Sequence, residues 1–230
     1  MYARFFKRAI DFTLSLMALI VLSPILLVLT VVGAIAMGGN PFFVQPRPGK
    51  KGKDGRERIF KLIKFRTMSN KRDSEGNLLP DEIRLNAYGR FLRSTSLDEL
   101  PELLNILAGD MAVVGPRPQL VRDMVFMTED QRRRHDVRPG LTGLAQCSGR
   151  NAMTWEKKFE YDLIYIDRIT LLFDIKIILK TAVKVFAREG ITEEGMATAA
   201  DLGDYLLAKG DVTEEEYAER QNEAKELLGV

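Results

Sequence analysis

The sequence predicts a helix-rich protein of mixed α/β class with a membrane-inserted N-terminus, and three observations predict it. Residues 12–37 form an uncharged, apolar run of 26 residues, longer than the roughly 20 needed to cross a bilayer. Short strand-like and helix-like segments follow without the βαβ alternation of a Rossmann sheet, and two short helical patterns end the chain. We therefore expect a membrane helix over residues 1–38, either re-entrant or spanning, a compact soluble body over 39–198 with short strands and amphipathic surface helices, and an acidic helical hairpin over 199–230.

The apolar run contains a central break that argues against a straight transmembrane span. Pro24 removes a backbone donor and clashes with the carbonyl of Ile20, which the hydroxyl of Ser23 can then bind. Basic residues flank the run on both sides, Arg4, Lys7 and Arg8 before it and Arg47, Lys50, Lys51 and Lys53 after it. The positive-inside rule then places both ends on the cytoplasmic side, as in a re-entrant hairpin. A proline-kinked transmembrane helix stays open on pattern alone, whereas a cleaved signal peptide has a shorter apolar region.

The body is predicted to begin with a strand and to continue as short helices. The strand is "ERIFKLIKFRTMS", in which two-residue alternation leaves Lys64 and Arg66 on one face. Helices are expected over residues 84–92, 102–107 and 119–126, with another opening near Thr128. A short strand in "DMAVVGPRPQ" stops at Gly115, "RPGLTGLAQCSGRN" is expected to be a loop, and the chain is helical from Trp155 onward.

A basic amphipathic helix is predicted over residues 173–189. Its basic residues recur at four-residue steps, at Lys176, Lys180, Lys184 and Arg188, and apolar residues fill the other face. Such a helix is typical of one lying on an anionic membrane surface. A core helix with a solvated lysine face has the same pattern, but the membrane segment in this chain favours the surface helix and anionic lipids as partners.

The tail is predicted to form two helices. The first covers residues 202–208 and ends at Gly210, and Thr213 with Glu216 forms a capping box that opens the second. The stretch "YLLAKGDVTEEEYAERQNEAKELLG" resembles the short C-terminal helical hairpins called SHOCT modules. Because two short helices bury little alone, we expect the hairpin to pack against the body or against a second copy, the latter giving a homo-oligomer.

Composition and charge restrict the chemistry. One His and one Cys, Cys147, provide no metal-ligand cluster, no CxxC motif and no disulfide framework. Zinc, iron–sulfur and Cys/His-dyad sites are therefore disfavoured. Residues 191–230 carry 11 acids and three bases, a net charge of −8. Because the whole chain has a net charge of +2, residues 1–190 carry a net charge of +10. A basic body of this kind favours anionic partners such as phosphates and lipid head groups.

Two adjacent acids, Asp98 and Glu99, stand out in "SLDELPELLN". They can be read as a helix N-terminus, in which Ser96 caps and Glu99 closes a capping box. However, Pro101 disturbs a helix that begins at Ser96, because it disfavours helical geometry at Leu100.

Arginines surround the two acids, with Arg84, Arg90 and Arg93 before them and Arg117 after them in "GPRP". Arginine forks match phosphate oxygens, and the prolines beside Arg117 hold its backbone in extended geometry. Two acids and several arginines without histidine suit phosphoryl chemistry with a divalent cation. The run "RRR" at 132–134 is better explained as a solvated or membrane-facing patch.

The order of several motifs resembles that of a known family. The motifs "KFRTM", "SLDELPELLNILAGDM", "VGPRP", "HDVRPGLTGLAQCSGRN" and "WEKKFEYD" occur in the order found in the bacterial sugar transferases, the monotopic phosphoglycosyl transferases. The chain is most similar to the small, PglC-like form, which also begins with basic residues, a hydrophobic run with a central Ser-Pro, and "QxRPG" as at residues 45–49. The resemblance covers residues 1–198 and leaves the acidic tail outside.

The resemblance implies an enzyme that moves a sugar phosphate from a UDP-sugar to a polyprenol phosphate, such as undecaprenyl phosphate, and releases UMP. Asp98 matches the nucleophile, which forms an aspartyl phosphosugar and also binds Mg²⁺. Glu99 matches the acid that assists proton removal from the lipid phosphate. Arg93 and Arg117 would hold phosphates, and Lys64 would lie in the site.

The same resemblance implies a location. The break at Ser23 and Pro24 matches the re-entrant helix of the family, which favours the re-entrant hairpin over a kinked span. The chain would then be monotopic in the bacterial inner membrane, with residues 39–198 as its cytoplasmic catalytic domain. The small form suggests an N-acetylated amino sugar as substrate, although other hexoses stay open, and the glycoconjugate pathway, whether protein glycosylation or polysaccharide synthesis, is not assigned.

Two other classes of function compete with the enzyme. A catalytically silent, membrane-anchored scaffold would have the same anchor, basic body and acidic tail, but it would not need the acids and arginines that are intact at each matched motif. A nucleic-acid binder is disfavoured, because the basic residues lack interleaved stacking aromatics and no reader motif is present.

Overall fold

The computed structural model describes residues 1–149, 153–187 and 200–229. The helices are η1 (Tyr2–Phe6), α1 (Lys7–Met37), α2 (Asp81–Arg84), α3 (Ala87–Thr95), η2 (Leu97–Glu99), α4 (Glu102–Ala108), α5 (Val121–Met124), α6 (Glu129–Arg132), η3 (Arg133–Asp136), α7 (Leu144–Ser148), α8 (Trp155–Asp167), α9 (Leu171–Ala187), α10 (Leu202–Lys209) and α11 (Glu214–Leu228). The strands are β1 (Phe42–Lys51), β2 (Glu57–Phe65), β3 (Ala112–Val114) and β4 (Gly140–Thr142). The predicted helix-rich α/β class is confirmed. The predicted boundary at residues 198/199 and the last basic residue of the surface helix, Arg188, lie outside the described residues.

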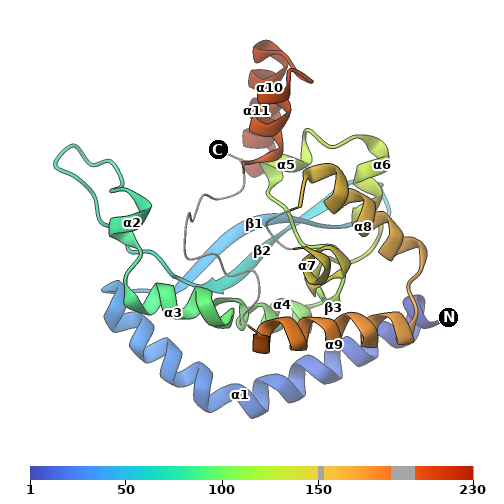
Figure 1. The fold of residues 1–230 in the computed structure, drawn as a ribbon, viewed down its shortest axis with the longest axis horizontal. Coiled ribbons are helices and arrows are strands. Elements are labelled where there is room, and N and C mark those ends of the chain that lie inside the picture. Colours follow the sequence, from blue (N-terminus) through green and yellow to red (C-terminus); the bar gives the residue numbers. More distant parts are fainter. Residues whose placement is uncertain (150–152, 188–199, 230) are drawn as a thin grey trace.

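Helix α1 is one hydrogen-bonded helix that continues through Pro24 rather than two separate helices. It is visibly bent, and Figure 1 shows both of its ends turned toward the rest of the molecule. The hydroxyl of Ser23 donates to the carbonyl of Ile20 at 2.8 Å. Pro24 has no backbone N–H, so the carbonyl of Ile20 lacks its usual helical donor. The prediction that the Ser23 hydroxyl binds this carbonyl instead is confirmed.

Both arms of α1 contact the body. In the first arm, the ammonium of Lys7 lies 2.7 Å from the buried carboxylate of Asp174 in α9. In the second arm, the hydroxyl of Tyr88 donates to the carbonyl of Leu29 at 2.8 Å. Gly33 allows this close approach, because a Cβ there would lie 2.7 Å from the Tyr88 hydroxyl. The helix is therefore held along its length and not only at one end.

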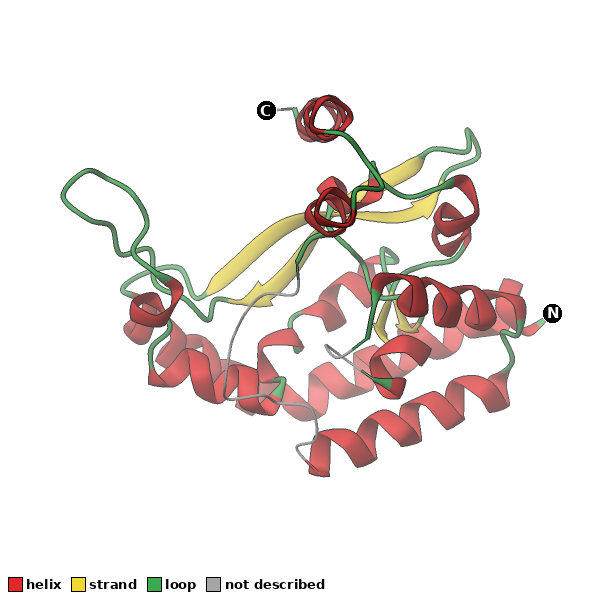
Figure 2. Cartoon of the chain, turned by 45° about the horizontal axis from the view of Figure 1, so that its top comes forward, coloured by secondary structure: helices red, strands yellow, loops and turns green. Residues whose placement is uncertain are grey.

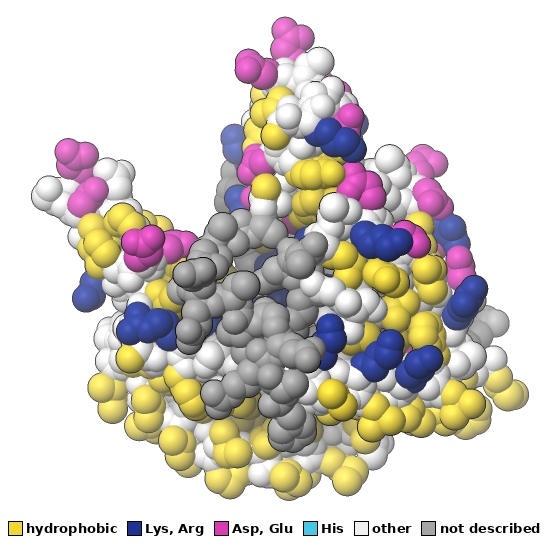
Figure 3. All heavy atoms as spheres, in the orientation of Figure 1, with side chains coloured by type: hydrophobic (Ala, Val, Ile, Leu, Met, Phe, Trp, Pro, Cys, Tyr) yellow, Lys and Arg dark blue, Asp and Glu magenta, His cyan; other side chains and the backbone are white. Residues whose placement is uncertain are grey.

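The remaining faces of α1 expose apolar side chains. These side chains line the lower edge of the molecule in Figure 3 and include Ile20, Val21, Leu27, Val28, Val31 and Ile35. Among the described residues, α1 is the one helix long and apolar enough to cross a membrane. An exposed apolar surface of this size is a membrane or protein contact surface.

Strands β1 and β2 form a long antiparallel ribbon in which Phe43 lies opposite Lys64. Strand β2 confirms the first part of the predicted strand but ends at Phe65, so Arg66 lies beyond it. Strand β1 was not predicted, because its sequence contains Pro46 and Pro48. Proline is tolerated here because each strand of a two-stranded ribbon has a free edge. Figures 1 and 2 both show the ribbon between α1 and the C-terminal helices.

A second, parallel pair joins β3 to β4. Gly115 and Gly140 pack backbone against backbone at its end, and a Cβ on Gly140 would overlap the nitrogen of Gly115. The prediction of a loop over "RPGLTGLAQCSGRN" was wrong in part, because this stretch contains β4 and α7. Strand β4 has three residues, too few for a detectable two-residue alternation.

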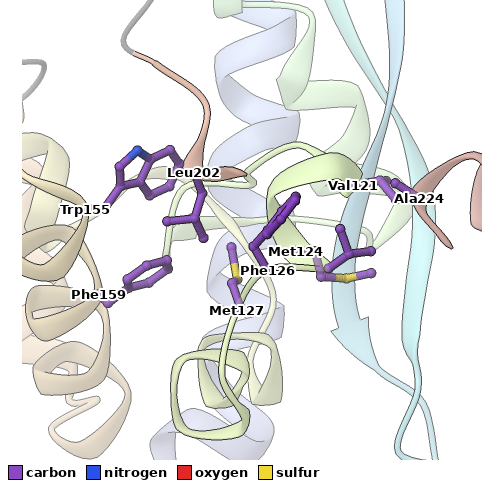
Figure 4. Close-up of a cluster of buried hydrophobic side chains, with 9 residues drawn as sticks. Val121, Met124, Phe126, Met127, Trp155, Phe159, Leu202 and Ala224 are labelled. Atoms are coloured by element: carbon purple, nitrogen blue, oxygen red, sulfur yellow. The ribbon is translucent and has the colours of Figure 1, made fainter. Parts of the chain in front are cut away.

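The C-terminal hairpin packs against the body, as one of the two predicted arrangements. Leu202 and Ala224 are 2% and 3% exposed. They join a cluster with residues of α5, of the segment that follows it and of α8, namely Val121, Met124, Val125, Phe126, Met127, Trp155 and Phe159 (Figure 4). The predicted capping box of α11 is half correct. Thr213 accepts from the amide of Glu216 at 3.1 Å, but the side chain of Glu216 pairs with Arg220 at 2.7 Å.

Candidate active site

The two predicted acids lie on η2, a single turn between α3 and α4. Ser96 starts this turn in the left-handed region, with φ 57° and ψ 19°, and it is the one non-glycine with positive φ among the described residues. The alternative reading, in which the side chain of Ser96 caps a helix, was wrong, because Ser96 makes no side-chain cap. Leu100 is helical rather than extended. Pro101 is the N-cap residue of α4. Proline is tolerated at the start of a helix, because a backbone N–H there has no acceptor within the helix. The acids are therefore presented by a strained backbone junction.

Two cations from separate parts of the fold bind Glu99. Its Oε1 accepts from Lys64 Nζ of β2 at 3.0 Å and from Arg117 Nη2, which follows β3, at 2.6 Å. The ammonium of Lys64 also lies 3.1 Å from Oε1 of Glu102, the first residue of α4. Three of the predicted site residues thus meet directly, and a further carboxylate joins them.

The two adjacent acids have opposite pKa shifts. Burial, together with the negative charge of Glu99, raises the pKa of Asp98 to about 6, against the opposing effect of Lys64 and Arg117. Burial would also raise the pKa of Glu99, but the charges and hydrogen bonds of Arg117 and Lys64 outweigh it and hold that pKa well below the usual range. Both cations form ion pairs with Glu99 and, among the described residues, none with Asp98. Asp98 therefore keeps a carboxylate that is available to a ligand.

The backbone around Arg117 is held by two other arginines. Arg134 donates to the carbonyl of Arg117 at 2.6 Å, and Arg47 donates to the carbonyl of Pro118 at 3.1 Å. Arg134 is buried and pairs with buried Asp162 at 2.7 Å. The interpretation of "RRR" as a solvated or membrane-facing patch was therefore wrong for this residue, which stabilises the loop that carries Arg117.

Arg93, the other predicted phosphate ligand, lies in the last turn of α3. Its Nε donates to the hydroxyl of Thr67 at 3.1 Å, just beyond the end of β2. The helix that carries it begins with a side-chain cap, since Asn86 accepts from the amide of Gly89 at 2.9 Å. The residue is thus anchored to the segment that follows Lys64 in the chain.

Comparison with known proteins gives a family for this arrangement. A sequence model described as bacterial sugar transferase matches residues 2–188, most of the chain. The chain belongs to the bacterial sugar transferase family. The matched region contains α1, the strands and every residue of the charged cluster, whereas the C-terminal hairpin lies outside it.

Relatives of this transferase come from several bacteria. It is 47% identical to the uncharacterized sugar transferase EpsL of Bacillus subtilis, over 90% of this chain and 98% of that protein. It is 41% identical to the UDP-glucose:undecaprenyl-phosphate glucose-1-phosphate transferase of Klebsiella pneumoniae, over 79% of this chain and 40% of that protein. It is 36% identical to the undecaprenyl-phosphate galactose phosphotransferase of Salmonella typhimurium, over 82% of this chain and 42% of that protein. The chain thus spans nearly all of the first relative and less than half of the other two.

Sequence reasoning missed three charged side chains that support the site of this transferase, Glu102, Arg47 and Arg134. Glu102 is four residues from Asp98, and its apolar neighbours in "ELLNIL" make it look like an ordinary helix-capping acid. Arg47 lies in the strand that was not predicted, and Arg134 was hidden in a run of arginines. Only the pairing of distant segments reveals that the three surround the same cluster.

The residues of the cluster fit a divalent cation that is shared with the substrate. The described residues contain no group of three or more His, Cys, Asp or Glu side chains that could hold a metal ion by themselves. Mg²⁺ is commonly bound by one or two carboxylates together with substrate phosphates, and the Asp98 carboxylate, free of ion pairs among the described residues, is suited to that role. Glu99 is less suited, because two cations already occupy its Oε1.

Proposed function

We propose that this transferase moves a sugar phosphate from a UDP-sugar to a polyprenol phosphate and releases UMP, through a covalent intermediate on Asp98. The observation that carries the proposal is the difference between the adjacent acids, since Glu99 holds both cations and Asp98 holds neither among the described residues. The names of the Klebsiella and Salmonella relatives, which specify undecaprenyl phosphate and glucose or galactose, support the donor and acceptor classes.

In the first step, a carboxylate oxygen of Asp98 forms a bond to the phosphorus that bears the sugar, and the bond from that phosphorus to the UMP oxygen breaks. Most Asp98 is ionised at neutral pH, because its pKa is about 6. In the second step, an oxygen of the lipid phosphate bonds to the same phosphorus, and the bond to Asp98 breaks, which regenerates the carboxylate. A two-step displacement lets a soluble donor and a membrane-bound acceptor use one nucleophile in turn.

Glu99 would take the proton of the lipid phosphate. Its resting partners, Lys64 and Arg117, make it a weak base by lowering its pKa. Substrate phosphates compete for the same two cations, since arginine and lysine bind phosphate oxygens well. Binding of the phosphates would thus loosen the hold on Glu99 and raise its basicity when the proton must move. Arg93 would provide a further cation for the phosphates.

A bound Mg²⁺ would neutralise charge on the donor diphosphate and on the leaving UMP. Asp98 would be the residue of this chain that holds the ion, together with the phosphates of the donor. No other residue is assigned to the cation.

The shape of α1 supports a monotopic arrangement. Both arms contact the body, through Asp174 and Tyr88, so neither arm is free to cross the bilayer away from it. Helix α9 adds exposed apolar side chains, with Leu172, Leu179 and Val183 at 79%, 61% and 68% exposure. We therefore propose that α1 enters and leaves one leaflet, that α9 lies on the anionic surface, and that the body faces the cytoplasm.

The proposal is tested by intact-protein mass spectrometry after incubation with Mg²⁺ and a panel of UDP-sugars, without lipid acceptor. The panel contains UDP-glucose, UDP-galactose and N-acetylated amino sugars, because the relatives are named for hexoses whereas the small form suggests amino sugars. A mass gain of one phosphosugar, absent in Asp98→Asn and lost on addition of undecaprenyl phosphate, is expected. No adduct with any donor, and no UMP release when lipid is supplied, would favour the silent scaffold.

A further inference from the structure

Glu102 is a buried carboxylate at the edge of the site for which the proposed reaction has no role. It is 2% exposed, and burying an ionised carboxylate is costly unless a cation compensates it. The compensating cation is Lys64, whose Nζ lies 3.1 Å from Oε1 of Glu102 and 3.0 Å from Oε1 of Glu99. One ammonium is therefore shared by two carboxylates from different elements.

The geometry of this contact is fixed by the backbone. Asn105, one turn after Glu102, donates to the carbonyl of Lys61 at 2.8 Å and accepts from the amide of Ile63 at 3.0 Å. Both ends of its amide thus bind β2 just before Lys64. Because α4 is locked to β2, Glu102 stays beside Lys64 regardless of what happens at Glu99.

The space beside Glu102 is too small for a substrate. Glu102 borders a cavity of ≈10 Å³ with Arg47, Lys64 and Arg117, room for about one water molecule and too little for a phosphate group. The Nε of Arg47 is buried there without a hydrogen-bond partner among the described residues. The charged groups that face Glu102 are thus Lys64 from β2, Arg47 from β1, Arg117 after β3 and Glu99 from η2.

We propose that Glu102 is a positioning residue that anchors the ammonium of Lys64 from the interior, so that this cation stays aimed at the donor diphosphate after Glu99 is released. The inference rests on the proposed function. Two properties of Glu102 are separable. Its Oε1 lies 3.1 Å from Lys64 Nζ, as an ion-pair contact without hydrogen-bond geometry, and its negative charge opposes the negative charge of the diphosphate.

Two substitutions in the full chain separate these properties. Glu102→Gln keeps an oxygen next to Lys64 but removes the charge, and we expect the Kd for UDP and the KM for UDP-glucose to fall about fivefold, the effect of one unit charge near the site, with kcat little changed. Glu102→Leu removes the oxygen, and we expect both constants to rise at least about tenfold. Glu57→Gln, which alters a buried acid at the far end of β2, is the matched control and should leave both constants unchanged.

The pH dependence provides a readout that a purely structural role would not change. Burial raises the pKa of Glu102 to about 7, as does the charge of Glu99, while Lys64 opposes the rise. As Glu102 ionises with rising pH, the KM for UDP-glucose should increase through neutrality, because the diphosphate of this donor does not titrate there. Glu102→Gln should lack this increase.

Thermal unfolding of each variant distinguishes binding from stability. Wild-type affinity and KM in Glu102→Leu at an unchanged Tm would overturn the inference. Equal losses in the Gln and Leu variants that follow a lowered Tm would also overturn it, because they would indicate a structural role alone. Binding of UDP is measured without turnover, so a wild-type protein that binds UDP but forms no adduct would contradict the proposed function and leave the test of Glu102 intact.

Discussion

The charged cluster at Glu99 and the C-terminal hairpin are both fixed to the same body, but by opposite means. The cluster joins Lys64, Glu99 and Arg117 from three elements through charge–charge contacts of 2.6–3.0 Å. The hairpin buries Leu202 and Ala224 in an apolar cluster and keeps most of its acids exposed. Activity should therefore depend on individual charges in the cluster, whereas stability should depend on individual contacts at the hairpin.

The largest expected effect is on activity, from Asp98→Asn. The amide is a poor nucleophile and cannot form the acyl phosphate, so UMP release should fall at least about 10³-fold. The matched hairpin variant is Asp204→Asn, which alters an acid that accepts from Tyr217 at 2.6 Å and should leave UMP release unchanged. Near-normal turnover of Asp98→Asn, after contamination by wild-type enzyme is excluded, would contradict the assignment.

Glu99→Gln should have the next largest effect. It removes the proton acceptor and weakens the attachment of Lys64 and Arg117, and a lost general base typically costs about 10²-fold or more. Rapid-quench measurement of the two half-reactions should show that discharge of the intermediate to the lipid slows more than its formation. Glu223→Gln, which alters an exposed acid of the hairpin, is the control and should leave both half-reactions unchanged. Equal slowing of both half-reactions would indicate that Glu99 acts only by holding the cations.

At the hairpin, Leu202→Asp should lower stability and leave activity unchanged. An unpaired carboxylate in the apolar cluster should lower the free energy of unfolding by about 2–4 kcal/mol, measured by thermal unfolding in detergent, with earlier proteolysis of the tail. Activity below the new Tm should persist, because the Arg117 loop is also held by Arg134 and Arg47 of the body. Leu227→Asp, at a side chain 45% exposed on the same hairpin, should change neither. A loss of activity without unfolding would show that the hairpin controls the site.

The same two regions explain how much the sequence could predict. The hairpin follows from local signals, since Gly210 ends α10 in the left-handed region and Thr213 caps α11. Its contact surface does not, because the apolar residues of α5 and α8 that receive Leu202 are far away in the chain. The half-formed capping box shows the same limit, since the choice of Glu216 between a backbone amide and Arg220 is decided only by folded geometry.

For the site, residue types and spacing predicted phosphoryl chemistry, and the resemblance supplied the roles of Asp98 and Glu99. The sharing of Lys64 between Glu99 and Glu102 could not be predicted, because it depends on the docking of α4 onto β2 through Asn105. The left-handed backbone of Ser96 could not be predicted either, since a serine before acids usually indicates a capping box and sequence does not reveal the sign of φ.

The smallest expected effect is the loss of folding stability at acid pH. We expect it to come from the body, at His135, rather than from the acidic hairpin. His135 is 4% exposed, and its Nδ1 lies 3.3 Å from Oε1 of Glu57. Burial lowers the pKa of His135 from 6.5 to about 4 despite this neighbour, so the folded protein resists a proton that the unfolded chain accepts. The resulting stability is complete above about pH 6.5 and is lost as pH falls toward about 4, by about 1–3 kcal/mol.

Chemical denaturation at a series of pH values measures this loss, and His135→Gln should flatten the curve between about pH 6.5 and 4. The hairpin acids are mostly exposed and exposed charges contribute little, so the triple variant with Gln at Glu214, Glu215 and Glu219 should keep the wild-type slope. If that triple variant flattened the curve and His135→Gln did not, the pH dependence of stability would come from the hairpin acids and not from His135 in the body.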